Sequence, residues 1–121
     1  MGTVRVVIVD DVAHVREELR RTMRLGKGLE VVGEAGDGRE ALRLVEESRP
    51  DVMLIDARMG GMDGLEATRR VKMEWPDIWV VVLTMHTECR ADALAAGADV
   101  FLAKGCPVQE LLDAVSIQKP D

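Results

Sequence analysis

Short continuous runs of apolar residues alternate with segments of helical period along the chain, and this alternation restricts the possible folds. Residues 4–9 form a β-branched run interrupted only by Arg5, which is typical of a strand buried on both faces. The apolar residues that follow recur at spacings of three and four, as on one face of a helix: Val12, Val15, Leu19 and Met23. Five repeats of strand and helix predict an α/β fold, a doubly wound parallel five-stranded sheet with helices on both faces. Right-handed crossovers favour the strand order 2-1-3-4-5.

The bounds of the other elements follow from the same periodicity and from turn residues. Further strands are expected over residues 29–35, 51–56, 78–84 and 98–103. Asp37 with Glu40 resembles an acidic capping box, so a helix is expected to begin there and to end before Pro50. Another helix follows the Gly-rich loop 58–64. The last two helices are expected over residues 88–96 and 107–115, since Pro107 is tolerated in a first helical turn.

The composition is that of a single globular domain. We expect residues 1–116 to form the domain and 117–121 a tail or the start of a linker, because 121 residues fit one core. The longest apolar stretch, residues 78–83, is too short to span a bilayer. No signal-like segment precedes the first strand, so a cytoplasmic protein without membrane contact is expected. Cys89 and Cys106 lack CxxC spacing, which favours two unpaired thiols over a disulfide or a zinc site.

Charge gives a further exclusion. The formal net charge of −6 argues against direct nucleic-acid binding by this domain, since such domains usually have a basic face. Residues 16–24 contain four arginines, but Glu17 and Glu18 lie among them. At helical spacing this cluster is interpreted as a solvated face with local ion pairs.

Four of the predicted strands end at residues suited to binding Mg²⁺ or a phosphoryl group. Asp10 and Asp11 follow the first strand, Asp56 ends the third, Thr84 ends the fourth, and Lys104 follows the fifth. Ligands of parallel α/β sheets bind outside the carboxyl ends of the strands, so these side chains are expected at one edge. One aspartate would suffice to cap the next helix. Two adjacent acids beside a third favour a divalent cation, Mg²⁺ or Mn²⁺.

Asp56 is the candidate nucleophile of this site. A carboxylate at the end of a stiff apolar strand is suited to accepting a phosphoryl group. Lys104 would supply a positive charge to that group and Thr84 a hydroxyl donor. Each residue taken alone has an ordinary interpretation: a polar residue that ends a strand, a solvated lysine and a β-branched strand residue. The repetition of such residues at strand ends favours the functional interpretation.

The motifs together resemble those of response-regulator receiver domains of two-component signalling, which have the flavodoxin/CheY-like fold. They extend over nearly all of the chain: Val-Asp-Asp at 9–11, Leu-Ile-Asp at 54–56, residues 59–64, Leu83-Thr84, Gly97-Ala98-Asp99 and Lys104. The stretches Leu83-Thr84-Met85-His86 and Leu102-Ala103-Lys104-Gly105 are similar to the NarL/LuxR-type branch.

The resemblance implies a role for each residue of the site. Asp56 would be the phospho-acceptor and Asp11 a direct Mg²⁺ ligand, with Asp10 supporting the metal through water. The backbone carbonyl of Arg58 would complete the protein ligands. Thr84 and Lys104 would contact the phosphoryl group. Phe101 falls where receivers carry an aromatic switch residue, which would change rotamer as Thr84 moves.

The chain also departs from the family pattern. Gly60 and Gly105 stand where receivers usually have Pro, and glycine leaves these loops less restricted. The stretch from Thr84 to Gly97 is about two residues shorter than expected, so the fourth helix should lose about half a turn. Arg58 and His86 lie two residues beyond Asp56 and Thr84, where receiver side chains overhang the phosphoryl group and tune its hydrolysis.

These features favour a receiver that accepts a phosphoryl group on Asp56 from a histidine kinase or a phosphotransfer protein, with Mg²⁺ (or Mn²⁺). It would switch the surface around the fourth helix, fifth strand and fifth helix, dimerise on phosphorylation, and regulate transcription through a DNA-binding domain outside this sequence. The alternative is a stand-alone relay protein without output. An aspartyl-phosphate phosphatase is disfavoured because position 58 is Arg rather than an acid, so we expect no enzyme beyond self-phosphorylation and self-dephosphorylation. A flavin- or nucleotide-binding domain is disfavoured because no Gly-x-Gly-x-x-Gly or P-loop motif is present.

Overall fold

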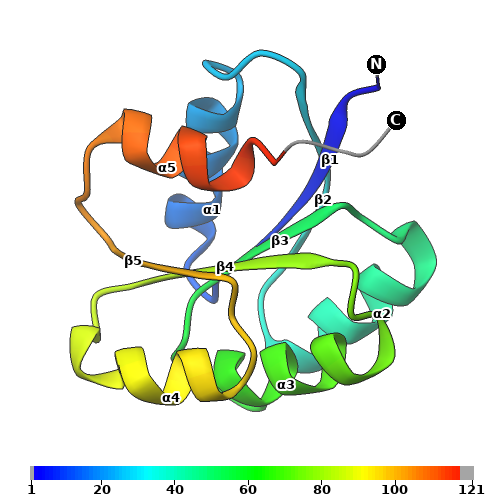
Figure 1. Ribbon diagram of the computed structural model, residues 1–121, viewed down its shortest axis with the longest axis vertical. Coiled ribbons are helices and arrows are strands. Elements are labelled where there is room, and N and C mark those ends of the chain that lie inside the picture. Colours follow the sequence, from blue (N-terminus) through cyan, green and yellow to red (C-terminus); the bar gives the residue numbers. More distant parts are fainter. Residues whose placement is uncertain (1, 118–121) are drawn as a thin grey trace.

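The computed structural model describes residues 2–117 and contains one sheet of five parallel strands (Figure 1). The strand order is β2-β1-β3-β4-β5, which confirms the predicted fold. The bounds of the strands are β1 Val4–Val9, β2 Leu29–Ala35, β3 Val52–Ile55, β4 Trp79–Thr84 and β5 Val100–Ala103. Because all neighbouring strands run in parallel, their carboxyl ends lie at the same edge of the sheet.

Helices cover both faces of this sheet (Figure 1). Their bounds are α1 Ala13–Met23, α2 Gly38–Ser48, α3 Gly64–Glu74, α4 Arg90–Ala95 and α5 Val108–Val115, with a short 3-10 helix, η1, over Thr87–Cys89. α1 and α5 pack on one face, and α2, α3 and α4 pack on the other. Within residues 2–117 no helix is long and apolar enough to cross a membrane.

The two apolar layers divide the residues of each central strand between them. In β1, Val6 and Ile8 pack in the layer of α1 and α5 together with Met23. Val7 and Val9 pack in the layer of α2, α3 and α4. All five side chains are almost completely buried. The continuous apolar run in the sequence therefore reflects burial on both faces, as predicted.

β4 begins one residue later than the sequence predicts, at Trp79. β3 and β5 also begin later, and at the start of each an aspartate carboxylate accepts a hydrogen bond from the neighbouring strand. The Arg5 N–H donates to Asp51 Oδ2 at 2.8 Å. In the same way the Val80 N–H donates to Asp99 Oδ2 at 2.8 Å. β3 and β5 therefore begin at residues 52 and 100 rather than at 51 and 98. At the other end, β3 stops one residue before Asp56.

The predicted helix over residues 88–96 is divided into η1 and the six-residue α4. The Cys89 N–H donates to the His86 carbonyl at 3.1 Å and closes the 3-10 turn. A 3-10 turn advances further per residue than an α-helix, so it spans the connection from β4 with fewer residues. The prediction of a shortened fourth helix is thus consistent with the structure, but its uniform α-helical form is wrong. Pro107 is the residue before α5 rather than part of its first turn.

The start of α2 matches the sequence closely. The Asp37 carboxylate accepts a hydrogen bond from the Glu40 N–H at 2.8 Å. The Glu40 carboxylate in turn accepts one from the Gly36 N–H at 3.2 Å, one residue earlier than in the usual reciprocal box. The helix ends with Arg49 in the left-handed region at φ 45°.

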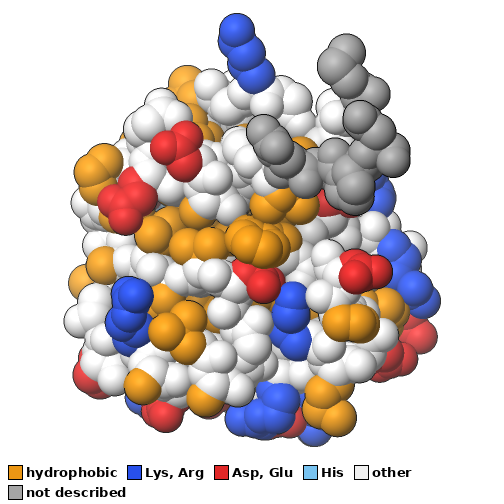
Figure 2. All heavy atoms as spheres, viewed as in Figure 1, with side chains coloured by type: hydrophobic (Ala, Val, Ile, Leu, Met, Phe, Trp, Pro, Cys, Tyr) orange, Lys and Arg blue, Asp and Glu red, His pale blue; other side chains and the backbone are white. Residues whose placement is uncertain are grey.

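The edge strand β5 leaves apolar side chains on the surface between α4 and α5. Val100 and Phe101 are half-buried, whereas every residue of the central strand β3 is buried. Figure 2 shows apolar side chains gathered across the middle of this face, between the two helical layers. This edge is therefore a surface on which a partner can bury apolar area.

Gly64, the first residue of α3, brings that helix directly against the end of β3. Its N–H donates to the Ala57 carbonyl at 2.9 Å. A Cβ added at this position would lie 1.8 Å from the carbonyl oxygen of Asp56, which is far inside contact distance. Only glycine therefore allows α3 to approach the backbone of the candidate phospho-acceptor this closely.

Gly64→Ala is expected to destabilise the protein by about 2 kcal/mol or more, because the methyl group forces α3 away from β3. Gly60→Ala is the matched control in the same loop, since an added Cβ there meets no atom within 4 Å. Urea unfolding of the two variants measures the difference. Equal stability of the two variants would show that the loop yields to the methyl group without cost.

Candidate functional site

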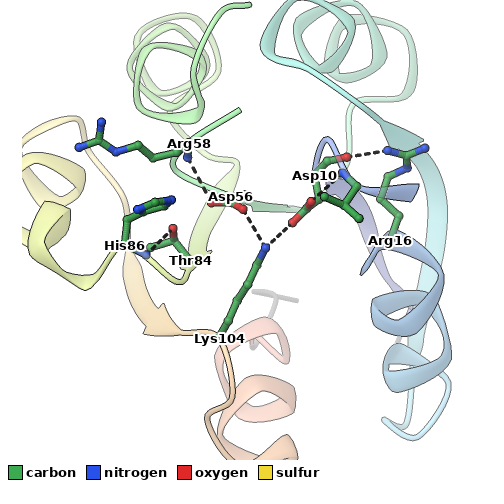
Figure 3. A network of polar contacts seen from close by, with 8 residues as sticks. Asp10, Arg16, Asp56, Arg58, Thr84, His86 and Lys104 are labelled. Carbon is green, nitrogen blue, oxygen red and sulfur yellow. Dashed lines mark hydrogen bonds and ion pairs between the residues drawn. The ribbon is translucent and has the colours of Figure 1, made fainter. Parts of the chain in front are cut away.

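The polar residues predicted at the strand ends converge at the carboxyl edge of the sheet (Figure 3). Asp10 follows β1 and is 1% exposed, and Asp56 follows β3 and is 8% exposed. Thr84, the last residue of β4, is completely buried. Lys104 follows β5, and its side chain is 17% exposed. Buried carboxylates need partners to remain charged, and the contacts below supply them.

The Lys104 ammonium bridges the two buried carboxylates. Its Nζ lies 2.8 Å from Asp10 Oδ2 and 2.8 Å from Asp56 Oδ2. The side chain reaches from the edge strand across the end of β4 toward the ends of β3 and β1 (Figure 3). A single cation is therefore shared by two acids that come from separate strands.

Asp10 serves the start of α1 as well as the site. Its Oδ1 accepts a hydrogen bond from the Val12 N–H at 3.0 Å, while Oδ2 faces Lys104. The N-cap of α1 is Val12, which has no side-chain cap, so the interpretation of an aspartate as the cap of this helix is wrong, and Asp10 instead holds the residue before the helix. Asp11, by contrast, is exposed.

Hydrogen bonds keep Asp56 ionised in spite of its burial. Desolvation alone would raise the pKa of the Asp56 carboxyl, but hydrogen bonds from Lys104, from the Arg58 N–H at 3.1 Å and from Thr84 lower it below its usual value. Desolvation likewise opposes the charge of Lys104, and the hydrogen bonds to Asp10 and Asp56 outweigh it, so the pKa of Lys104 is raised. These contacts thus favour the charged forms of the Asp56 carboxylate and of the Lys104 ammonium beside it.

The residues two positions beyond Asp56 and Thr84 differ in orientation. The Arg58 side chain is exposed and extends away from Asp56 (Figure 3). The His86 N–H donates to the Thr84 hydroxyl oxygen at 3.1 Å, and the His86 imidazole is half exposed, 3.7 Å from Glu88. His86 therefore contributes its backbone to the site.

Phe101 is half-buried on β5 and contacts α4. It packs against the apolar layer of α2, α3 and α4. The Arg90 guanidinium lies 5.7 Å from the centre of its ring, within the range of a cation–π contact. The candidate switch residue is thus in direct contact with the short helix after β4.

The donor set fits a hard divalent cation in part. Asp10 and Asp56 offer buried carboxylate oxygens that already face one positive charge, and Mg²⁺ prefers such oxygen ligands. Within residues 2–117, however, no three acidic, His or Cys side chains converge on a common metal position. The structure therefore brings together two of the three predicted acids, and the roles of Asp11 and of the Arg58 carbonyl stay predictions.

Arg16 is the residue of this region whose place the sequence analysis missed. The arginine cluster of residues 16–24 is interpreted above as a solvated face, and the Arg21–Glu17 ion pair agrees with that. Arg16 instead donates from Nη1 to the backbone carbonyl of Asp10 at 2.6 Å. No local signal in the sequence distinguishes Arg16 from the solvent-facing arginines of the same helix.

The comparison with protein families agrees with this geometry. The family model described as "Response regulator receiver domain" matches residues 6–116. The chain belongs to the receiver-domain family of response regulators. Receiver domains act in two-component signalling, and phosphorylation and Mg²⁺ dependence are general properties of the family.

Individual relatives confirm the resemblance to the NarL/LuxR-type branch. The receiver domain is 40% identical over 114 residues to response regulator UvrY of Escherichia coli K12, covering 93% of this chain and 52% of UvrY. It is 39% identical over 117 residues to response regulator GacA of Pseudomonas aeruginosa PAO1, covering 93% of this chain and 53% of GacA. The chain thus spans about half the length of these curated relatives.

Among solved structures, the signal receiver domain of the putative response regulator NarL from Mycobacterium tuberculosis superposes with a TM-score of 0.88. The two chains are 38% identical, and the match covers 95% of this chain and 94% of that domain. This similarity supports the strand order and the helical layers described above.

Lys104→Met is expected to destabilise the receiver domain by about 2–3 kcal/mol in metal-free buffer, because it leaves two buried carboxylates without their cation. Adding Asp10→Asn to this variant should recover part of the loss by removing one uncompensated charge. The exposed Lys27 gives the matched control, Lys27→Met. Chemical unfolding in EDTA measures the four proteins, and a Lys104→Met variant as stable as Lys27→Met would contradict the expectation.

Proposed function

We propose that this receiver domain is a phosphorylation-controlled switch in which Asp56 accepts a phosphoryl group from a phosphohistidine. The donor would be a sensor histidine kinase or a phosphotransfer protein. The observation that carries the proposal is the buried Asp56 carboxylate directly after β3, with its Oδ2 2.8 Å from the Lys104 Nζ. A carboxylate in this form is a competent nucleophile toward phosphorus.

The reaction requires few protein groups. An Asp56 carboxylate oxygen forms a bond to phosphorus, while the bond between phosphorus and the imidazole nitrogen of the donor breaks. That nitrogen keeps the electron pair and takes up a proton, and an acyl phosphate remains on Asp56. Because Asp56 directly follows the buried strand β3, its carboxylate is fixed in position before the donor arrives, which reduces the entropy cost of the transfer.

Magnesium would be held by Asp10, Asp11 and Asp56 together with the backbone carbonyl of Arg58. When bound, the ion would neutralise charge on the transferring phosphoryl oxygens. Two features of the chain support this: Asp10 and Asp56 offer oxygen ligands to one common position, and Asp11 is the next residue along the chain.

Lys104 and Thr84 would bind the transferred group. The Lys104 ammonium already faces Asp56 and would follow the added charge to a phosphoryl oxygen. The Thr84 hydroxyl oxygen accepts from the His86 N–H and keeps its own proton to donate. Movement of Thr84 toward the phosphoryl group would therefore also carry the start of the β4–α4 connection.

The switching surface would comprise α4, β5 and α5. Phe101 would fill the space that Thr84 leaves, and its contact with Arg90 of α4 would change with it. The apolar edge along β5 (Figure 2) would then present a different surface to a partner, including a second copy of the chain.

The output that we propose is regulation of transcription in the cytoplasm through a DNA-binding domain outside this sequence. The support for it is that the chain is similar to about half the length of the response regulators UvrY and GacA. The receiver domain itself would not bind nucleic acid, in keeping with its net charge of −6. A relay protein without output is the alternative that the experiments below distinguish.

Incubation with Mg²⁺ and acetyl phosphate is expected to give a single phosphoryl adduct by intact mass spectrometry, and Asp56→Asn is expected to abolish it. The adduct should also be lost when EDTA removes the metal. Asp63→Asn is the matched control, because Asp63 caps α3 in the loop that begins at Asp56 without being an expected acceptor. An adduct that persists in Asp56→Asn at the wild-type rate would place the acceptor elsewhere.

A switch and a relay differ in their response to beryllofluoride, a stable mimic of the phosphoryl group. Bound to Asp56 with Mg²⁺, it is expected to shift the NMR signals of Phe101 and of α4 as well as those of the site. Size-exclusion chromatography should detect any accompanying dimer. Shifts confined to residues around Asp56, with Phe101 and α4 unchanged, would favour the relay.

A further inference from the structure

Arg16 connects α1 to the ends of two strands without belonging to the set of groups around Asp56. Its Nη1 donates to the backbone carbonyl of Asp10 at 2.6 Å, and its Nε lies 3.4 Å from Glu34 Oε1 on β2. The side chain is only 22% exposed. Figure 3 shows the guanidinium directed at the carbonyl of Asp10.

The carbonyl that Arg16 binds has a particular place in the chain. It belongs to the peptide group that joins Asp10 to Asp11, and a peptide group is planar. Fixing this oxygen therefore fixes the orientation of the Asp11 backbone nitrogen and Cα. On its other side, the Asp10 N–H donates to the Ala35 carbonyl at 3.1 Å. Both backbone groups of Asp10 are thus tied to β2, the second one through Arg16 and Glu34.

The orientation of this backbone determines where the Asp10 carboxylate points. Its Oδ1 is held by the Val12 N–H and its Oδ2 faces Lys104. A rotation of the peptide between Asp10 and Asp11 would move both acids relative to Asp56. Groups outside the coordination sphere that hydrogen-bond to metal-binding residues orient those residues, and their loss commonly weakens metal binding.

We propose that Arg16 is a positioning residue for the phosphoryl-transfer site, which holds the Asp10–Asp11 peptide in the orientation that Mg²⁺ binding requires. This inference rests on the proposed function. Arg16 acts through the Asp10 backbone, while Glu34 orients the guanidinium.

Arg20 offers a matched control in the same helix. It also pairs with Glu34, through Nη1 and Oε2, and its side chain is 39% exposed. Arg16→Gln and Arg20→Gln remove the same charge from α1 and one ion pair from the same carboxylate. Only Arg16→Gln removes the hydrogen bond to the Asp10 carbonyl.

Electrostatics and positioning predict opposite signs for the Arg16 variant. Loss of a positive charge near two acids would by itself strengthen Mg²⁺ binding, and it would do so in both variants. Loss of the correct Asp10–Asp11 orientation weakens binding, and only in Arg16→Gln. The direction of the change therefore separates the two effects.

The experiment titrates Mg²⁺ into the three proteins, wild type and the two variants, and follows two quantities. The first is the Mg²⁺ concentration that gives half-maximal phosphorylation by acetyl phosphate, together with the rate at saturating Mg²⁺. The second is direct Mg²⁺ binding, followed by the backbone amide NMR signals of Asp10, Asp11 and Val12. Thermal unfolding of the metal-free proteins shows whether each variant is folded.

Arg16→Gln is expected to raise both half-saturating concentrations about tenfold, with a smaller change in the rate at saturation. Arg20→Gln should stay within about twofold of wild type, as expected for an exposed ion pair. Equal shifts in the two variants, or tighter binding by Arg16→Gln, would overturn the inference while the proposed function stands. A wild-type protein that neither binds Mg²⁺ nor accepts a phosphoryl group would overturn the proposed function and the inference with it.

Discussion

The contact of one ammonium with two buried carboxylates organises the functional edge of this molecule. Lys104 lies 2.8 Å from both Asp10 and Asp56, and without it neither acid could remain charged at so little exposure without a large cost. The ends of β1, β3 and β5 are therefore tied together by charge in addition to the backbone ladder. Under the proposed function, the positive charge that balances the two carboxylates would also balance the charge of an added phosphoryl group.

The sheet supplies the framework for this arrangement. Parallel pairing brings all strand ends to one edge, and burial on both faces fixes the central strands so that their terminal residues have little freedom. The helices hold in place the loops that follow the strands. α1 carries Arg16, which holds the backbone of Asp10, and α3 begins with Gly64, which lies against the backbone of Asp56. A residue of a helix thus contacts the backbone of each of the two aspartates, Asp10 and Asp56.

Much of this could be predicted from the sequence because the strong signals are local. The β-branched runs predicted the strands and their burial, and polar residues at their ends predicted which side chains meet. The interaction of Arg16 with the Asp10 carbonyl could not be predicted in the same way, because an arginine on a helix has the same local pattern whether it faces solvent or a neighbouring loop. The later starts of β3 and β5 depend on Asp51 and Asp99 bonding to an adjacent strand, which is a tertiary contact. The 3-10 turn before α4 likewise depends on the distance that the connection must span.

The close approach of Gly64 to Asp56 makes the α3 side of the site rigid, whereas the side of β4 and α4 can yield more easily. On the α3 side, the gap at the Asp56 carbonyl is too small even for a methyl group. α3 therefore has no free space into which the backbone of Asp56 could shift. On the opposite side, Thr84 leads into a 3-10 turn and a six-residue helix that begins without a side-chain cap. A phosphoryl group added to Asp56 would therefore meet a fixed backbone on the α3 side. Under the proposed function, the added volume would therefore displace β4 and α4 rather than α3.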